Sequence, residues 1–317
     1  MLLNELILEF AKGNISKPDY IDRMHEIHKI LFEYSKLIQE TDISKIEITD
    51  DTVQMTTREH AIKFIVDKDD ARIVPIEILN FGTYEKSQMD MILKLVQDGQ
   101  TVMDVGGNIG WFSLTLAKLK KNLNIYAFEP IPKTFDYLTK NIELNHLGKI
   151  KCFNFGFSNF EGTIPFYYYS QGSGNASMVN VSERADVEVQ ECKVMLLDEF
   201  VKKNKLTVDF IKCDVEGAEL FVFQGATETL QTQKPIIATE MLRKWAAKYD
   251  YHPNKIISLM SGLGYGCFTT DGQHLLPFSI MDESTVETNF LFLHKVKHRL
   301  IMDPLIFPLS AMPKSFS

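Results

Sequence analysis

Seven residues, Asp104–Gly110 (Asp-Val-Gly-Gly-Asn-Ile-Gly), constrain the fold of this 317-residue chain more than any other stretch. The apolar, β-branched run Thr101–Val105 is typical of a strand, and the run Trp111–Lys121 that follows the glycines is typical of a helix. Glycines at such a junction allow a sharp turn and let a ligand approach closer than a Cβ atom would permit. The sequence therefore predicts a strand-turn-helix unit with a ligand-binding turn.

The next predicted strand, Asn124–Phe128, ends in an acid, Glu129, followed by Pro130. A carboxylate at this position can accept hydrogen bonds from both hydroxyls of a ribose, as in nucleoside-binding βαβ units. A dinucleotide cradle would need glycines at positions i, i+2 and i+5, but the i+2 residue after Gly106 is Asn108. The pattern therefore favours S-adenosylmethionine over NAD; the alternative is a plain structural corner.

The bulk composition restricts the class of protein. A formal net charge of −8 argues against a large nucleic-acid footprint, which would need a basic face. The four cysteines are scattered and form no C-x-x-C pair, which argues against a zinc knuckle and suits a reducing compartment. Residues 1–10 include Glu5 and Glu9 and lack a basic start, and no apolar run reaches membrane-spanning length. We therefore expect a cytoplasmic protein that contacts neither nucleic acid nor membrane.

Helix and strand periods alternate from Tyr84 onward, which predicts an α/β fold with a doubly wound, mainly parallel sheet. The expected strands are 101–105, 124–128, 150–155, 208–213, 236–240, 265–270 and 290–294, with an extra pair at 162–169 and 188–196. The expected helices are 85–97, 111–121, 133–145, 197–203, 218–231 and 254–263.

Residues 1–80 have a different pattern and are predicted to form a helical and short-strand appendage. Helices are expected through Gln39, with an apolar stripe at helical spacing, and short strands are expected at 43–48, 53–57, 61–66 and 72–79. The predicted organisation is an appendage at 1–80, a cofactor-binding domain at 81–299 and a tail at 300–317. The appendage could be purely structural, could cover the substrate, or could form a homo-oligomer.

An ordered series of short motifs carries a family resemblance over roughly residues 80–270. The motifs are Gly82-x-Tyr84-Glu85, Asp104–Gly110, Phe128-Glu129-Pro130, Asn141, Asn145, Leu197-Asp198, Ile211–Glu219, Gly225-Ala226, Pro235 and Glu240. In their order and spacing the chain resembles the FkbM-type S-adenosylmethionine-dependent methyltransferases. Gly107 stands where alanine is usual, and Cys213 where an aliphatic residue is usual. The resemblance implies a class I methyltransferase fold, which is Rossmann-like, and methylation of a hydroxyl, without naming the acceptor.

The residues expected to bind the cofactor lie in or near the glycine turn and the ends of the next two strands. They are Asp104, Gly106, Gly107, Asn108, Gly110, Glu129, Pro130 and Ser158. The glycines would admit the methionyl part, Asp104 would orient the turn or the amino group, and Glu129 would bind the ribose. The turn at 154–158 is expected beside the adenine.

Three acids are predicted where the fourth and fifth strands end, at the edge where such sheets bind ligands: Asp214, Glu216 and Glu240. An alcohol needs its proton removed during methyl transfer, so these acids are candidates to position or deprotonate the acceptor. Each acid has a simpler alternative role. Asp214 could cap the next helix, Glu216 could be an acid in the first turn of that helix, where the helix dipole stabilises negative charge, and Glu240 could pair with Arg243.

Three further features are less specific. His252 could reach the same edge as a general base, although a solvent-exposed or structural role is the alternative. The acids could hold a divalent cation such as magnesium, but no histidine joins them at a recognisable spacing, so a metal is disfavoured. The polar loop Ser170–Ser177 beside the aromatic run Phe166–Tyr169 is either a lid over a small-molecule or glycan acceptor, or an irregular hairpin connection.

The alternatives to a methyltransferase are an NAD-type oxidoreductase and a non-catalytic binding protein that retains the fold.

Overall fold

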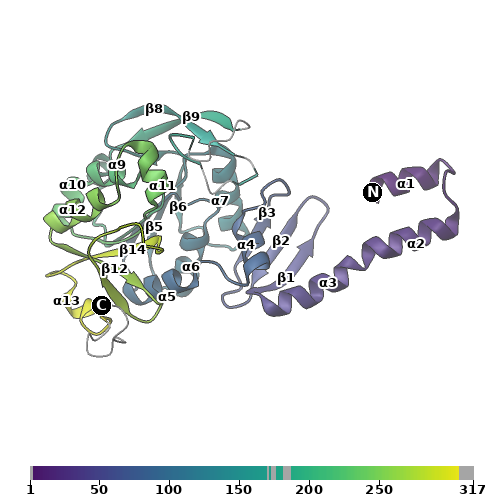
Figure 1. Ribbon diagram of the computed structural model, residues 1–317, viewed down its shortest axis with the longest axis horizontal. Coiled ribbons are helices and arrows are strands. Elements are labelled where there is room, and N and C mark those ends of the chain that lie inside the picture. The colour runs from purple at the N-terminus through teal and green to yellow at the C-terminus, as the bar shows by residue number, and fades with distance from the viewer. Residues whose placement is uncertain (1–2, 170, 173–175, 181–186, 307–317) are drawn as a thin grey trace.

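The computed structural model describes residues 3–169, 171–172, 176–180 and 187–306, and an eight-stranded sheet forms its centre (Figure 1). In spatial order the strands are β13 (Leu275–Phe278), β12 (Tyr265–Thr270), β14 (Asn289–His294), β11 (Ile236–Glu240), β10 (Phe210–Cys213), β4 (Thr101–Val105), β5 (Asn124–Phe128) and β6 (Lys151–Phe153). The five strands from β11 to β6 are parallel, and the other three add antiparallel pairings. The predicted mainly parallel sheet is confirmed.

Helices cover both faces of this sheet, because alternate residues of each central strand point to opposite sides. Val102 of β4 packs into one apolar cluster with the helices α5, α6 and α7, whereas Met103 packs into a second cluster with α8, α9 and α12. The helices of this part are α5 (Lys86–Leu95), α6 (Trp111–Leu119), α7 (Pro132–Leu144), α8 (Leu197–Asn204), α9 (Glu219–Gln224), α10 (Thr227–Thr232), α11 (Arg243–Ala246), the 3-10 turn η3 (Ala247–Tyr249), α12 (Asn254–Gly262) and α13 (Arg299–Met302).

The order of the strands reverses at β4. Along the chain β4 leads to its neighbour β5 on one side, while β10, which comes later, pairs with β4 on the other side. The carboxyl ends of β4 and β10 therefore flank a topological switch point, where open α/β sheets bind their ligands. A small second sheet, β7 (Gly156–Phe157), β9 (Glu188–Met195) and β8 (Gly162–Tyr168), lies at the top of Figure 1. Its β8–β9 pair matches the predicted strand pair.

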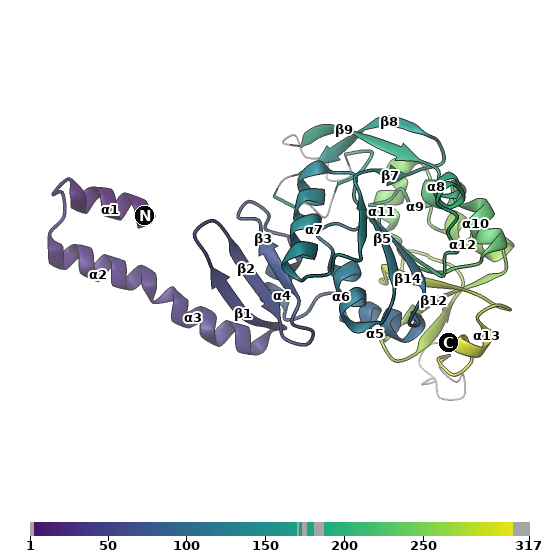
Figure 2. The ribbon, with the colours of Figure 1, turned by 180° about the vertical axis from the view of Figure 1, so that it is seen from behind.

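The N-terminal residues form an arm and a third sheet. The arm comprises α1 (Leu3–Ala11), α2 (Lys17–His28), α3 (Ile30–Leu37) and the 3-10 turn η1 (Ile38–Glu40), and the sheet comprises β1 (Ile43–Ile48), β2 (Val53–Thr57) and β3 (Lys63–Val66). Both ribbon views show α2 and α3 extending far from the body, with α1 folding back along α2 (Figures 1 and 2). The predicted helices and three of the four predicted strands are confirmed.

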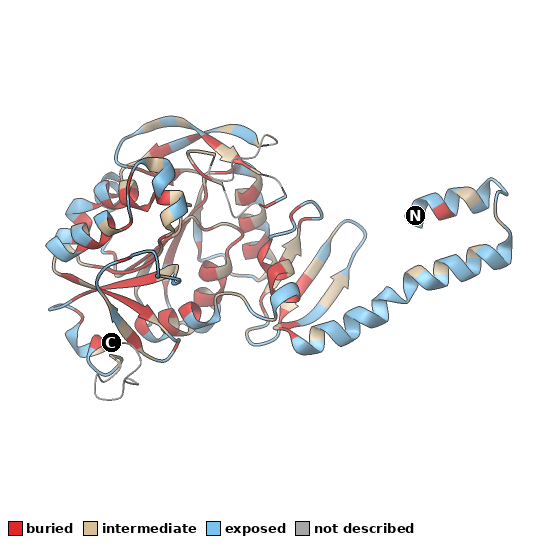
Figure 3. Cartoon of the chain, in the orientation of Figure 1, coloured by how far each residue is buried: buried red, intermediate tan, exposed pale blue. Residues whose placement is uncertain are grey.

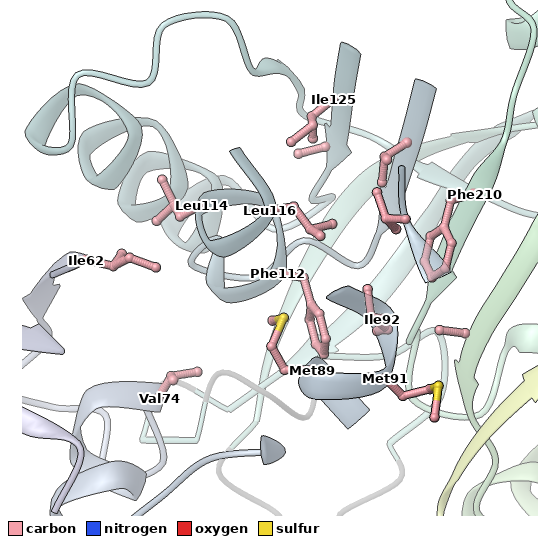
Figure 4. Packing of buried hydrophobic residues seen from close by; sticks show 14 of the residues in the cluster. Ile62, Val74, Met89, Met91, Ile92, Phe112, Leu114, Leu116, Ile125 and Phe210 are labelled. Atoms are coloured by element: carbon pink, nitrogen blue, oxygen red, sulfur yellow. The ribbon is translucent and has the colours of Figure 1, made fainter. Parts of the chain in front are cut away.

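The third sheet is joined to the main domain through a shared core. Buried Ile62 and Val74 belong to the same apolar cluster as Phe112, Leu114 and Ile92 of the main domain (Figure 4). Two asparagines, Asn141 within α7 and Asn145 at its C-cap, strengthen the joint by binding the backbone of β3. The bonds run from Ile65 N to Asn141 Oδ1 (2.9 Å), from Asn141 Nδ2 to Ile109 O (2.9 Å), from Lys63 N to Asn145 Oδ1 (2.8 Å) and from Asn145 Nδ2 to Lys63 O (2.7 Å). Asn141 thereby ties β3 to the glycine turn.

Two predicted elements are wrong. Residues 72–79 were expected as a strand but form the helix α4 (Val74–Phe81), which begins with Pro75 in its first turn, where proline is favoured. A short apolar run does not distinguish strand from buried helix by its period alone. Residues 218–231 form two helices instead of one. The break lies at Gly225, where an added Cβ would stand 2.1 Å from the Ser158 carbonyl oxygen. The strand β13 was not predicted.

The described residues contain no helix that is both long and apolar enough to span a membrane. The tail predicted at 300–317 falls mostly outside the described residues, since only its part up to residue 306 is covered.

Candidate functional site

The glycine turn after β4 is shaped by close backbone contacts. The amides of Gly106 and Gly107 donate to the Phe128 carbonyl at 3.0 and 2.9 Å, which fixes the turn on the end of β5. Gly106 has φ +79°, and an added Cβ would lie 1.8 Å from the carbonyl oxygen of Asp214. Glycine is therefore required at this position, because any side chain would push apart the two loops that follow β4 and β10. Asn108 also has a left-handed backbone, with φ +47°.

Glu129 holds the far side of the same turn. Its Oε2 accepts a hydrogen bond from Asn108 N at 3.0 Å, and its Oε1 accepts one from Ile131 N at 2.9 Å. The side chain is 5% exposed, and this burial raises the pKa of Glu129 to about 7 against the opposing effect of the two amides. Each carboxylate oxygen has a second lone pair, so the group can still accept hydrogen bonds from a ligand.

A crevice of about 90 Å³ lies between this turn and the loop after β10. Its described lining includes Val74, Tyr84, Val105, Gly106, Gly107, Asn108, Ile109, Trp111, Phe112, Glu129, Pro130, Gly156, Phe157, Phe166, Ala176, Met178, Lys212, Asp214, Val215 and Glu216. The volume is below the roughly 300–1,000 Å³ typical of ligand pockets. Phe166, Ala176 and Met178 form part of the wall, so a nucleoside would require these side chains to move aside.

Several polar atoms on the crevice wall are buried without a hydrogen-bond partner among the described residues. They are Asn108 Oδ1, Trp111 Nε1, Asp214 Oδ1 and Glu216 Oε2. Buried polar atoms are normally paired, so such a group calls for an explanation. A polar ligand in the crevice would supply the missing partners, and the residues present therefore fit a ligand with both donors and acceptors.

The three acids predicted at the sheet edge do lie together. Asp214, Glu216 and Glu240 each offer a carboxylate oxygen, and these oxygens lie within 4.8 Å of one another. Burial and the neighbouring carboxylates raise the pKa of Glu240 to about 9 and that of Glu216 well above its usual value. At neutral pH Glu240 therefore keeps its proton and can donate a hydrogen bond, and the pKa of Glu216 is shifted in the same direction.

The simpler roles considered for two of these acids are wrong. Asp214 does not cap the following helix, because α9 begins at Glu219 and its N-cap, Ala218, makes no side-chain capping bond. Arg243, the expected partner of Glu240, lies instead 3.8 Å from Glu283. Glu219 closes the turn, since its Oε1 accepts from the amides of Val215 and Gly217 at 3.0 and 3.1 Å.

Lys212 is the cation among the acids at this edge of the sheet, and its role was not predicted from the sequence. It lies in β10 opposite Asp104 of β4, and its Nζ is 3.3 Å from Asp214 Oδ2 and 3.9 Å from Asp104 Oδ1. The nearby carboxylates raise the pKa of this buried lysine despite the opposing effect of desolvation. The Nζ also donates to the Gly106 carbonyl at 3.2 Å and lies 4.8 Å from the centre of the Phe112 ring. Lys212 therefore links both loops of the crevice.

Two further site residues were not predicted as such, although both belong to the motif Gly82-x-Tyr84-Glu85. Tyr84 lines the crevice and meets Trp111 edge-on at 5.8 Å between ring centres. Glu85 precedes α5 with a left-handed φ of +45°, and burial together with the Asp214 charge raises the pKa of Glu85 to about 7. Only this motif in the sequence could have pointed to them, because they lie far from the acids along the chain.

Five predicted site residues are absent from the described lining of the crevice: Asp104, Gly110, Ser158, Glu240 and His252. Asp104 is buried within β4 and accepts a hydrogen bond from Ser113 Oγ at 2.6 Å. Ser158 is fully buried beside Gly225, and its neighbours Gly156 and Phe157 line the crevice instead. His252 is exposed at the start of α12, where its Nδ1 accepts from Asn254 N at 3.2 Å.

The loop considered as a lid is partly covered by the structure, since residues 170 and 173–175 lie outside the described residues. Its described end is anchored, because Ser177 exchanges two backbone hydrogen bonds with Tyr167 and is fully buried. The Ser177 hydroxyl lies 3.2 Å from Tyr249 Oη. Ala176 and Met178, on either side of this anchor, line the crevice. The segment therefore contributes to the wall of the site.

Known proteins share features with this chain. Residues 104–267 match the family described as the methyltransferase FkbM domain. Methyltransferase sdnD of Sordaria araneosa is 31% identical over 156 residues, covering 40% of this chain and 60% of the relative. Hexuronic acid methyltransferase AglP of Haloferax volcanii is 29% identical over 154 residues, covering 48% of this chain and 61% of the relative.

This chain thus spans about three-fifths of the length of these curated relatives. Among solved structures, methyltransferase FkbM from Methylobacillus flagellatus KT superposes with a TM-score of 0.41 at 16% identity, covering 62% of this chain and 44% of that chain.

Proposed function

Because the chain belongs to the FkbM methyltransferase family, we propose that it transfers a methyl group from S-adenosylmethionine to a hydroxyl of a small-molecule or glycan acceptor. The observation that supports this most is the crevice between the glycine turn and the acid cluster, with buried polar atoms that lack partners on its wall. One side of it is suited to a nucleoside and the other to a hydroxyl-bearing acceptor.

The cofactor side is formed by the turn after β4 and the end of β5. The backbone of Gly106 and Gly107 would lie against the methionyl part, Glu129 would accept the ribose hydroxyls, and Gly156 and Phe157 would flank the adenine. S-adenosylmethionine supplies an electrophilic methyl group on a positively charged sulfur. The protein's task is to align donor and acceptor, exclude water and take up one proton.

The acceptor side is formed by Asp214, Glu216 and Glu240, with Glu85 nearby. In the proposed reaction the acceptor hydroxyl oxygen would bond to the methyl carbon as the bond from that carbon to sulfur breaks, which would leave the demethylated cofactor as a neutral thioether, and the Asp214 carboxylate would take up the hydroxyl proton. Glu240, which the raised pKa keeps protonated at neutral pH, would donate a hydrogen bond to another hydroxyl of the acceptor, and Glu216 would form a further hydrogen bond beside it. The proton then leaves from Asp214 to solvent, which restores the ion pair with Lys212.

Two other functions would lead to different results. An NAD-type oxidoreductase would change nicotinamide absorbance during turnover. A non-catalytic binding protein would bind S-adenosylmethionine yet give no methylated product with a broad panel of hydroxyl acceptors. Magnesium held by the three clustered acids is a further alternative, since oxygen ligands suit this ion. Loss of turnover after chelation, with recovery on adding magnesium, would support it.

Calorimetric titration with S-adenosylmethionine and its demethylated product tests the proposal. We expect the substitution Glu129→Ala to weaken cofactor binding by about tenfold or more, because it removes a charged hydrogen-bond acceptor, roughly 1.5–3 kcal/mol. Glu129→Gln separates this effect from damage to the turn, since an amide oxygen can still accept from one backbone amide. Exposed Glu161→Ala is the control and should leave affinity unchanged. No binding by the native protein would exclude the proposed function, and unchanged affinity in Glu129→Ala would refute the ribose contact.

A further inference from the structure

The two long helices of the N-terminal arm contain no buried residue. This holds for all of α2 and all of α3, and the burial view shows them almost entirely exposed (Figure 3). Isolated helices shorter than about 12–15 residues are marginal in water, and helices in proteins gain most of their stability from packing. Here α2 has 12 residues and α3 has 8. Within its own chain the arm packs mainly through α1 on α2, where Phe10 stacks on Tyr20, so a further surface would stabilise it.

The arm carries more apolar surface than a monomer normally exposes. Ten large apolar side chains of α1, α2 and α3 are between 37% and 69% exposed: Leu3, Ile7, Leu8, Phe10, Ile21, Ile30, Leu31, Phe32, Tyr34 and Leu37. At roughly 150–200 Å² for each complete side chain, the exposed part amounts to roughly 700–1,000 Å². This equals the area of about 800 Å² that each partner buries in a standard protein interface.

An apolar groove continues this surface toward the body. The groove runs between α3 (Leu31, Tyr34), the sheet face of β1 and β2 (Ile46, Ile48, Val53, Met55) and α7 (Tyr137), and it encloses about 950 Å³. Charged residues also belong to its lining: Asp51, Asp67, Lys68, Asp69 and Lys133. In the sheet Ile46 pairs with Met55, and Ile48 pairs with Val53, so all four side chains share one face. The inner end of this face is covered, since Met55 is 4% exposed, but the outer end is open, since Ile48 is 70% exposed.

We propose that the arm and the groove form a homodimer interface, in which the arm of each copy packs into the groove of the other. The apolar stripe and the groove lie on one continuous surface, so an antiparallel second copy can cover both at once. Interfaces of this isologous, twofold kind are the commonest among soluble oligomers. The dimer would bury the apolar side chains of α2 and α3 that the single chain leaves exposed.

The charge of the arm favours a second copy over other occupants. Residues 3–40 contain five Lys or Arg and seven Asp or Glu, so the arm is close to neutral with both signs interspersed. Two such arms do not repel each other strongly. An anionic membrane or a nucleic acid would instead require a clearly basic surface, which this arm lacks.

Sedimentation velocity of the full chain over a hundredfold concentration range tests the proposal. We expect dimers for the native protein. The substitution Leu31→Asp, in the groove wall and the stripe, should raise the dissociation constant by about a hundredfold or more. Leu300→Asp is the matched control, since Leu300 is 91% exposed on α13, far from the arm, and it should leave the dissociation constant unchanged (Figure 1).

Hydrogen exchange provides a second readout that does not depend on a variant folding. Amide protection in α2, α3 and β1–β2 should rise with protein concentration, whereas protection in β4 and β10 should not change. A protein that remains monomeric at all concentrations overturns the proposal, as does a dimer that Leu31→Asp leaves unchanged. Binding of the monomer to vesicles of anionic or neutral phospholipid also overturns it and assigns the arm to a membrane surface.

Discussion

The crevice and the N-terminal arm depart from the usual burial pattern in opposite directions. At the crevice the chain buries Lys212, Asp104 and Glu129, whereas along the arm it exposes Phe32, Leu31 and other large apolar side chains. Burying a charge is costly unless it is paired, and leaving an apolar side chain in water forgoes the main stabilising effect of folding. We propose that another molecule completes each of these two surfaces. In the proposals above these are the cofactor with its acceptor, and a second copy of the chain.

The two regions also differ in how their own contacts hold them in place. The crevice is fixed by bonds between elements distant in sequence, such as Lys212 Nζ to the Gly106 carbonyl. The arm is held by local bonds within its helices and by a hairpin contact, in which the Phe10 and Tyr20 rings stack at 4.4 Å. A single change should therefore affect stability strongly at the crevice and weakly on the arm.

The largest effect is expected from Lys212→Met. Removing the ammonium leaves Asp104 and Asp214 without their shared cation, and breaking a buried ion pair in this way costs about 3–5 kcal/mol. Chemical denaturation should show this loss in the free energy of unfolding. Lys193→Met, at an exposed site on β9, is the control and should change it by less than about 0.5 kcal/mol. A loss below about 1 kcal/mol for Lys212→Met would mean that the cluster does not depend on this cation.

The next effect concerns turnover. Asp214→Asn should lower kcat by about a hundredfold or more, because the acceptor loses its proposed base. The affinity for S-adenosylmethionine should stay within about threefold of the native value, as calorimetry can measure. Glu283→Gln, at a side chain that is 99% exposed, should leave both quantities unchanged. Full activity in Asp214→Asn would limit this residue to holding Lys212.

A smaller effect is expected from pH. The raised pKa of Glu240, about 9 in the folded protein against an ordinary value of 4.5, means that the folded state keeps a proton that the unfolded state has lost. The stability should therefore fall as the pH rises from 6.5 to 9, with a decrease in Tm of roughly 5 °C. Below pH 6.5 His298 opposes this fall in stability. Burial lowers its pKa to about 4, so the folded state binds fewer protons there than the unfolded state, and the stability gains from a rise in pH. Glu240→Gln should flatten the decrease above pH 6.5, and an unchanged slope would contradict the raised pKa.

The smallest effect is expected on the arm. Phe32→Ser, at a side chain that is 69% exposed, should change the free energy of unfolding of the dilute, monomeric protein by less than about 0.5 kcal/mol. Denaturation should be measured at the lowest usable concentration, where association does not contribute. A loss of 2 kcal/mol or more would show that the arm packs on its own chain, and would remove the contrast between the two regions.

Local patterns predicted most of the elements of the main domain. The limits of β4, β5 and β11 are the predicted ones, since each is a short apolar run between clear turn residues. The pattern failed where packing decides. The strand expected at 72–79 is α4, because its apolar residues pack as one helical face on the shared core. The single helix expected at 218–231 is broken at Gly225 by the close approach of the Ser158 backbone.

The sequence by itself determined the mainly parallel sheet, the glycine turn and the acids at the strand ends, because these depend on short-range periodicity and on glycine's backbone freedom. Only the tertiary structure decided that Lys212 joins the acids, that Glu85 and Tyr84 lie at the site and that His252 lies outside the crevice lining. It also decided that the arm's apolar stripe faces no core of its own chain. The physical reason is that burial, pairing and pKa depend on which distant segments meet, and the local sequence pattern does not carry that information.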